Sequence, residues 1–225
     1  MAISTGDILG NSQVGVYLTV VGNNLFYPSS LDKPAIEEIS QCFDLEMNPM
    51  LIGGSSLLGS LIVGNNKGIA VADIATEEDL DKLSSFGEVV ILESGVNAAG
   101  NLVECNDYGA IVSKSIPTPG VELIGEVLGV KTARTRVAGQ DTVGSLLVAN
   151  NKGILSHPDI SSSEVKEIEA VMSVPVMVGT VCFGSPYVGA GCVTSENDAL
   201  VGSGSTGPEL NRIEDALGLI VPFIS

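Results

Sequence analysis

The chain has 225 residues, of which 44% are hydrophobic, so it is long enough for a hydrophobic core and too apolar to be disordered. Its 10 Lys and Arg against 27 Asp and Glu give a formal net charge of −17, and so acidic a surface argues against general nucleic-acid binding. The sequence has no apolar run of about 18 residues, so we expect no membrane span. Its N-terminus has no basic segment followed by an apolar stretch, so we expect no secretory signal and a cytoplasmic protein.

The sequence repeats itself five times. Residues 59–69 and 144–154 are identical at nine of eleven positions, and a glycine recurs at intervals of 44, 41, 44 and 45 residues. The five repeats cover approximately 1–52, 53–93, 94–137, 138–180 and 181–225. We interpret each recurring glycine as the start of an apolar strand; these are Gly15, Gly59, Gly100, Gly144 and Gly189.

Each repeat predicts a β-hairpin, a helix and a third strand. In chain order the hairpins pair 16–20 with 25–27, 60–63 with 69–71, 102–104 with 110–112, 145–148 with 154–156, and 190–193 with 199–201. The helices follow the capping residues Asp32, Thr76, Thr118, Ser161 and Thr206, and their apolar stripes include Ile39, Leu83, Ile124, Ile168 and Ile213. The third strands are expected at 49–52, 89–92, 132–137, 174–179 and 219–224.

One repeat is too small to bury its own helix stripe and sheet face, so the five copies must share one assembly. Residues 2–4 resemble a strand and residues 221–224 are apolar, which suggests that the two ends of the chain meet. Closure also removes exposed strand edges. We therefore expect a single α/β domain over 1–225, a closed propeller with five-fold pseudosymmetry.

Such a ring would bring its polar hairpin tips to one end. The tips are residues 65–67, 106–108, 150–152 and 196–197. A flat polar disc suits contact with another protein better than small-molecule catalysis, although asparagine and aspartate are also ordinary turn residues.

A basic strand stands out in this acidic chain. Lys131, Arg134 and Arg136 lie in one segment, which we expect nearest the axis of the ring, either paired with acids or contacting an anion.

The cysteines and the single histidine limit the chemistry. Cys42, Cys105, Cys182 and Cys192 form no C-x-x-C pair, so we expect buried, reduced thiols and no zinc or redox site. His157 is the only histidine, which excludes a histidine-rich metal cluster, and it is expected to be a solvated loop residue.

Three segments carry a resemblance to a known family: 105–112, 143–158 and 174–185. Over essentially its whole length the chain resembles the translation initiation factor 6 family of archaea and eukaryotes, which has the pentein fold. The resemblance implies binding to the large ribosomal subunit, beside a ribosomal protein at the subunit-joining face, and obstruction of small-subunit joining. It also implies roles in subunit biogenesis and translation initiation. We expect a monomer without cofactor, catalytic activity or membrane association.

The same resemblance implies a set of ribosome-contact residues, led by Asn65 and Asn106. Eukaryotic members carry an arginine at the position of Ser60 and an aromatic residue at that of Leu146. The full candidate set is Ser60, Asn65, Asn66, Lys67, Asn106, Asp107, Leu146, Asn150, Asn151 and Lys152.

An enzyme is the alternative hypothesis. The pentein architecture also occurs in guanidine-modifying hydrolases and transferases, which use a cysteine nucleophile and a histidine in the axial cavity. In this chain those roles would fall to Cys182 or Cys192 and to His157.

Overall fold

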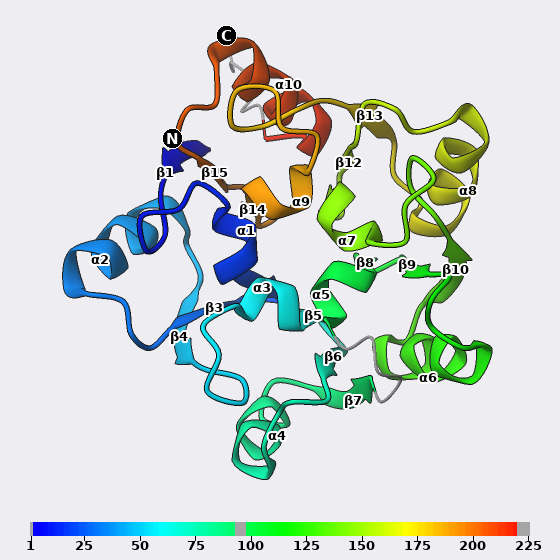
Figure 1. Cartoon of the computed structure of the whole chain (residues 1–225), viewed down its shortest axis with the longest axis horizontal. Coiled ribbons are helices and arrows are strands. Elements are labelled where there is room, and N and C mark those ends of the chain that lie inside the picture. The colour runs from blue at the N-terminus through cyan, green and yellow to red at the C-terminus, as the bar shows by residue number, and fades with distance from the viewer. Residues whose placement is uncertain (1, 93–97, 220–225) are drawn as a thin grey trace, which may run out of the picture.

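The computed structural model of the protein describes residues 2–92 and 98–219. Within these ranges the fold is mixed α/β, with five three-stranded sheets and ten helices. Figure 1 shows five similar units around a common centre, with one short helix of each unit near the centre and one longer helix at the periphery. No helix in the described part of the chain is long and apolar enough to span a bilayer.

Each unit has the same order of elements: a short helix, two antiparallel strands, a longer helix and a third strand parallel to the second. The first unit comprises α1 (Val14–Tyr17), β2 (Thr19–Val21), β3 (Asn24–Pro28), α2 (Lys33–Cys42) and β4 (Glu46–Met50). The second comprises α3 (Leu58–Leu61), β5 (Ile62–Gly64), β6 (Gly68–Ala72), α4 (Glu77–Leu83) and β7 (Glu88–Leu92). The third comprises α5 (Ala99–Leu102), β8 (Val103–Cys105), β9 (Gly109–Ser113), α6 (Thr118–Leu128) and β10 (Lys131–Thr135).

The last two units follow the same plan. The fourth comprises α7 (Val143–Leu146), β11 (Leu147–Ala149), β12 (Ile154–Ser156), α8 (Ser162–Met172) and β13 (Val176–Val178). The fifth comprises α9 (Val188–Gly191), β14 (Cys192–Thr194), β15 (Ala199–Gly202) and α10 (Gly207–Leu217). Its third strand comes from the N-terminus: β1 (Ile3–Gly6) pairs in parallel with β15. The strand predicted at 219–224 falls, from residue 220 onward, outside the described residues.

The recurring glycines do not start strands, and that prediction is wrong. Each is the second residue of a one-turn helix, and the strand begins only after the turn. The cause is tertiary packing, because the five turns meet at the centre and α1 contacts both α3 and α9. A Cβ atom on Gly59 would collide with the carbonyl oxygen of Gly15. A Cβ atom on any other recurring glycine would likewise collide with the carbonyl oxygen of the recurring glycine before it, and for Gly15 that glycine is Gly189 of the fifth unit.

The outer helices pack where the sequence predicts. Ile39, Leu83, Ile124, Ile168 and Ile213 are all buried. Helices α2, α6, α8 and α10 lie against the sheet of the preceding unit, as α6 does against β6 and β7. Helix α4 shares a core cluster with Phe26 and Met50 of the preceding unit. The core is therefore shared between neighbouring units, and one of its clusters joins α2 of the first unit to β14 and β15 of the fifth.

The helix caps follow the sequence with one exception. Asp32, Thr76 and Ser161 accept hydrogen bonds from backbone N–H groups of the first helical turn. At α6 the capping residue is Pro117 instead of Thr118, which is already helical.

The expected position of the basic strand is wrong. Among the strands of the described ranges β10 pairs only with β9, whereas β8 of the same sheet lies at the axis and contacts β5 and β11. Arg136 lies just beyond β10 and pairs with exposed Asp141 at 3.0 Å. The third strand of each sheet is its outer edge, so these charges cannot line the centre.

Candidate functional site

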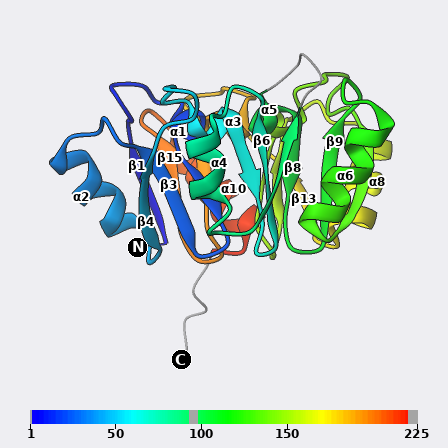
Figure 2. The same cartoon turned by 90° about the horizontal axis from the view of Figure 1, so that it is seen from below.

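The hairpin turns of the five units gather at one end of the molecule, which we call the tip face. Figure 2 shows these turns at the end opposite α1, α3 and α5. Residues from all five turns line a shared depression around the axis. We choose one of them from each turn and call these five the tip rim: Gly22, Asn66, Asp107, Asn151 and Glu196.

Side-chain hydrogen bonds join the residues of the tip rim. Asp107 accepts from the Asn66 backbone N–H at 3.1 Å and from the two side-chain amides of Asn66 and Asn151 at 2.6 and 2.7 Å. Glu196 accepts from the backbone N–H of Asn151 at 3.0 Å. The rim therefore presents two carboxylates and two amides in a fixed arrangement.

Three of the predicted contact residues are buried beneath this rim. Asn65, Asn106 and Asn150 are each 5% exposed. The Asn106 side-chain amide donates to the carbonyls of Asn150 and Met172 at 3.2 and 3.0 Å, which belong to the next unit. Its side-chain oxygen accepts from two backbone N–H groups of its own turn, those of Tyr108 and Gly109.

Asn65 and Asn150 make the equivalent four bonds at their own unit boundaries. Each of these asparagines thus connects the tip of one unit to the tip and the outer helix of the next unit. The preference of asparagine for turns does not predict this role. We call the three residues the asparagine clamps.

The predicted lysines are exposed on the tip face. Lys67 donates from Nζ to the carbonyl of Gly129 at 2.8 Å, and Lys152 donates to the side-chain oxygen of Asn197 at 3.0 Å. Both lysines therefore lie over the boundary with the next unit, where a partner could reach them.

Ser60 and Leu146 are not brought together with the tip residues. They lie in α3 and α7, at the opposite end of the molecule, and are 8% and 0% exposed. Neither side chain can contact a partner in this conformation.

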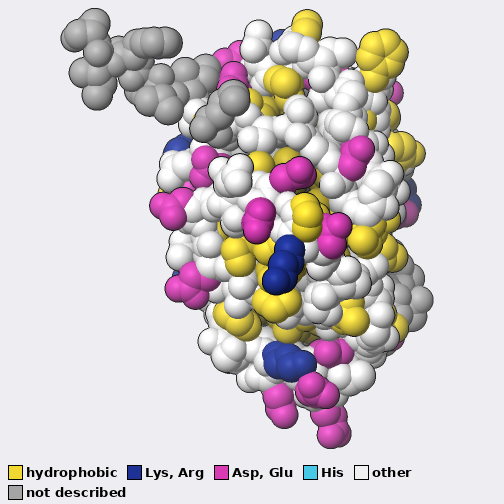
Figure 3. Space-filling model, turned by 90° about the vertical axis from the view of Figure 1, so that its left-hand side faces the viewer, with side chains coloured by type: hydrophobic (Ala, Val, Ile, Leu, Met, Phe, Trp, Pro, Cys, Tyr) yellow, Lys and Arg dark blue, Asp and Glu magenta, His cyan; other side chains and the backbone are white. Residues whose placement is uncertain are grey.

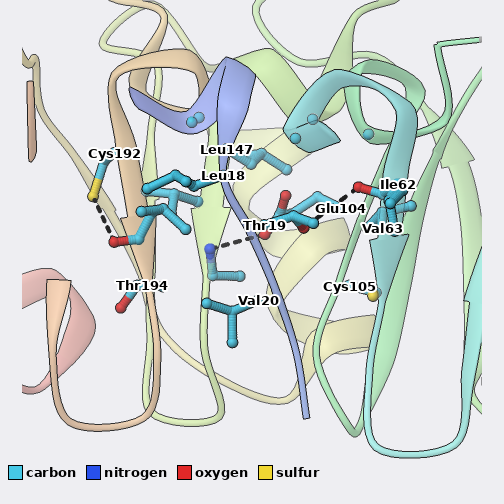
Figure 4. Close-up of a pocket in the computed structure, with 18 of the residues that line it drawn as sticks. Leu18, Thr19, Val20, Ile62, Val63, Glu104, Cys105, Leu147, Cys192 and Thr194 are labelled. Carbon is cyan, nitrogen blue, oxygen red and sulfur yellow. Dashed lines mark hydrogen bonds between the residues drawn. The ribbon is translucent and has the colours of Figure 1, made fainter. Parts of the chain in front are cut away.

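A cavity of about 80 Å³ lies on the axis between the recurring glycines and the tip rim, and we call it the axial cavity. The residue four positions after each glycine lines it: Thr19, Val63, Glu104, Val148 and Val193. Glu104 projects into this space (Figure 4) and accepts a hydrogen bond from the backbone N–H of Ala149 at 2.9 Å. Burial raises the pKa of Glu104 to about 8.

Glu104 is a residue that the sequence analysis missed. Aligning the repeats at the glycines would have exposed it, because the other four units carry threonine or valine there. A carboxylate at a position otherwise occupied by uncharged, mostly apolar residues was the available signal.

We predict that Glu104→Gln makes stability less dependent on pH. In the folded state Glu104 keeps its proton up to about pH 8, whereas the unfolded chain releases it near the ordinary value of 4.5. The folded state therefore binds more protons, and the free energy of unfolding falls across this range, by ~3 kcal/mol for a shift of this size. Urea denaturation at about pH 5 and about pH 8 measures the difference. An identical pH profile for both proteins would contradict the prediction.

The geometry does not favour the enzyme alternative. Burial raises the pKa of the thiols of Cys105, Cys182 and Cys192, which opposes formation of a nucleophilic thiolate. His157 is 6% exposed, so its expected solvation is wrong, and its Nδ1 atom accepts from the backbone N–H of Asp159. The described residues contain no group of three or more side chains suited to a metal ion.

Comparison with known proteins identifies the chain's relatives. The model of the eIF-6 family matches residues 3–216. The chain is 37% identical to translation initiation factor 6 of Haloquadratum walsbyi over 218 residues, 96% of each chain. It is 36% identical to the protein of that name from Methanoculleus marisnigri, over 96% of this chain and 98% of the relative. It is also 36% identical to that from Saccharolobus islandicus, over 94% of this chain and 97% of the relative.

Proposed function

The chain belongs to the eIF-6 family of translation initiation factors, and from this premise we propose that it binds the large ribosomal subunit and prevents the small subunit from joining. The match across residues 3–216 is the observation that carries this proposal. We assign it roles in subunit biogenesis and translation initiation, in the cytoplasm, as a monomer that needs neither a cofactor nor a membrane.

The proposed binding surface is the tip face. Its exposed or half-buried members of the predicted set are Asn66, Lys67, Asp107, Asn151 and Lys152. These residues would contact the ribosome directly, whereas the buried asparagine clamps would hold them in place. Ser60 and Leu146 lie at the other end and take no part in the contact.

The charge of the protein favours a basic partner. The net charge is −17, and acidic side chains are scattered over the side of the molecule seen in Figure 3 with few Lys and Arg among them. A ribosomal protein with an exposed basic surface at the subunit-joining face would be attracted over a distance of about 10 Å, and salt would weaken this attraction. The same charge disfavours general binding to nucleic acid.

A rigid body explains how binding would obstruct joining. We propose that residues 1–225 form one domain, a closed propeller of the pentein type built from the five repeats. The contacts of α1 with α9 and of β2 with β14, together with the pairing of β1 and β15, support closure. A closed domain of 23.1 kDa would exclude the small subunit by its volume alone, without covalent chemistry.

Pelleting with purified ribosomal subunits tests the proposal. The protein should pellet with the large subunit and not with the small one, more strongly at low salt than at moderate salt. Glu196→Lys reverses a charge on the tip rim and should weaken binding about tenfold. Glu37→Lys makes the same change on the exposed face of α2 and serves as the matched control. Equal effects of the two variants would contradict the tip face as the binding surface.

A further inference from the structure

One side of the axial cavity carries a carboxyl group. Of the five residues four positions after the recurring glycines, only Glu104 ionises. No Lys, Arg or His lines the cavity among the described residues, and the single hydrogen-bond partner of the Glu104 carboxylate is the neutral N–H of Ala149. A half-buried carboxylate that faces this axial space without a counter-ion favours a cation there once it is ionised.

One further acceptor lies at the same cavity. Thr19 is among its lining residues. The Thr19 hydroxyl donates its proton to the carbonyl of Ile62 at 3.4 Å, so its oxygen retains lone pairs. With Glu104 it offers oxygen acceptors to a cation that carries several donors.

The approach to the cavity is also acidic. The axial cavity and the depression inside the tip rim share the lining residues Cys105, Ala149 and Thr194, so one leads to the other. Asp107 and Glu196 lie on the rim. A cation arriving at the tip face therefore meets carboxylates at the entrance and another at the far end.

We propose that the axial cavity binds a primary ammonium group, with the Glu104 carboxylate as its counter-ion and the hydroxyl of Thr19 as a further acceptor. A volume of about 80 Å³ accommodates several water molecules or one alkylammonium head. An ammonium group carries its three donors on a compact charge, which fits a cavity of this size better than the planar fork of a guanidinium does. The ammonium could belong to a free amine or to a lysine side chain of a partner polypeptide.

Binding is coupled to the ionisation of Glu104. The other titratable side chains that face the cavity, Cys105 and Cys192, stay neutral because burial raises the pKa of both thiols. Asp107 on the rim adds only negative charge. The ammonium group therefore displaces a proton from Glu104, and its affinity rises as the pH passes through the Glu104 pKa of about 8, where half of the carboxyl groups are ionised.

Carbon-13 NMR of the glutamate carboxyl groups tests the proposal on the wild-type protein. Saturating methylammonium chloride should lower the apparent pKa of Glu104 by about one unit. Tetramethylammonium chloride at the same concentration is the matched control, because that cation has the same charge and no donor. Glu104→Gln identifies the signal by its disappearance; if that variant does not fold, assignment of the wild-type spectrum replaces it. The same pKa in both salts would overturn the proposal.

A second arm distinguishes the two sources of the ammonium group. N-acetyl-lysine amide carries the group on a flexible chain attached to a peptide backbone. A fall in the pKa of Glu104 with this probe as well indicates a lysine of a partner, and a fall with methylammonium alone indicates a free amine. Neither arm uses ribosomes, so its outcome is independent of the proposed function.

Discussion

Replacing Asn106 with alanine will lower the free energy of unfolding by about 4 kcal/mol, since the side chain makes four hydrogen bonds in a buried position and each is worth about 1 kcal/mol. The carbonyls of Asn150 and Met172 and the N–H groups of Tyr108 and Gly109 would be left buried without these partners. Alanine cannot replace any of the bonds.

Urea denaturation of the two proteins measures this loss. Asn23→Ala is the matched control, because Asn23 is exposed in the corresponding turn of the first unit and the same substitution there should change stability by less than about 0.5 kcal/mol. Equal stability of Asn106→Ala and wild type would show that the clamp does not hold the units together. A loss of ribosome binding by a fully stable variant would instead make Asn106 a direct contact.

Gly144→Ala will destabilise the protein by about 3 kcal/mol or more, because it introduces an atom where two backbones touch. The new Cβ would lie 2.7 Å from the carbonyl oxygen of Val103 and closer still to that of Gly100. Neither obstacle is a side chain that could turn away. To remove these collisions, α7 must move away from α5. Because each inner helix contacts the next one around the axis, the other inner helices would have to move as well.

Thermal and urea denaturation of Gly144→Ala check the prediction. Gly207→Ala provides the matched control, since Gly207 begins α10 and a Cβ there has no atom within 4 Å. That variant should be as stable as wild type or slightly more so, because alanine favours a helix over glycine. If both variants have wild-type stability, close approach of the inner helices does not explain the recurring glycines.

The outer layer of the fold could be predicted from the sequence, because its elements are long enough to show a period. The stripe through Ile39, Leu83, Ile124, Ile168 and Ile213 identified five helices, and all five residues are buried. The predicted hairpins are also present, although their first strands begin later than expected. Local patterns of apolar and turn residues were sufficient for these elements.

The centre of the fold could not be predicted in the same way. A four-residue segment such as Val14–Tyr17 is too short for its apolar residues to show whether it is a helix or a strand. Packing around the axis selects the helical turn. The asparagine clamps illustrate the same difficulty. Asparagine is common in exposed turns, and nothing local indicates that the next unit covers Asn65, Asn106 and Asn150.

The clamps also show where the five units differ. At the corresponding positions the first unit has Val21 and the fifth has Ser195. The hydroxyl of Ser195 accepts from backbone groups of its own turn, at Asn197 and Asp198, and valine has no polar side chain. The junctions on either side of the first unit therefore lack the clamp. The junction with the fifth unit relies on apolar packing and on β1, and the junction with the second unit includes the hydrogen bond from Thr19 to Ile62.

The central claim is that this protein keeps ribosomal subunits apart, and a subunit-joining experiment tests it most directly. Purified large and small subunits are mixed with increasing amounts of the protein under conditions that favour joining, and the products are separated by sedimentation in a sucrose gradient. We predict that joined ribosomes decrease as the protein increases, that the protein migrates with the free large subunit, and that Glu196→Lys is less effective than Glu37→Lys. An unchanged amount of joined ribosomes at saturating protein would contradict the account.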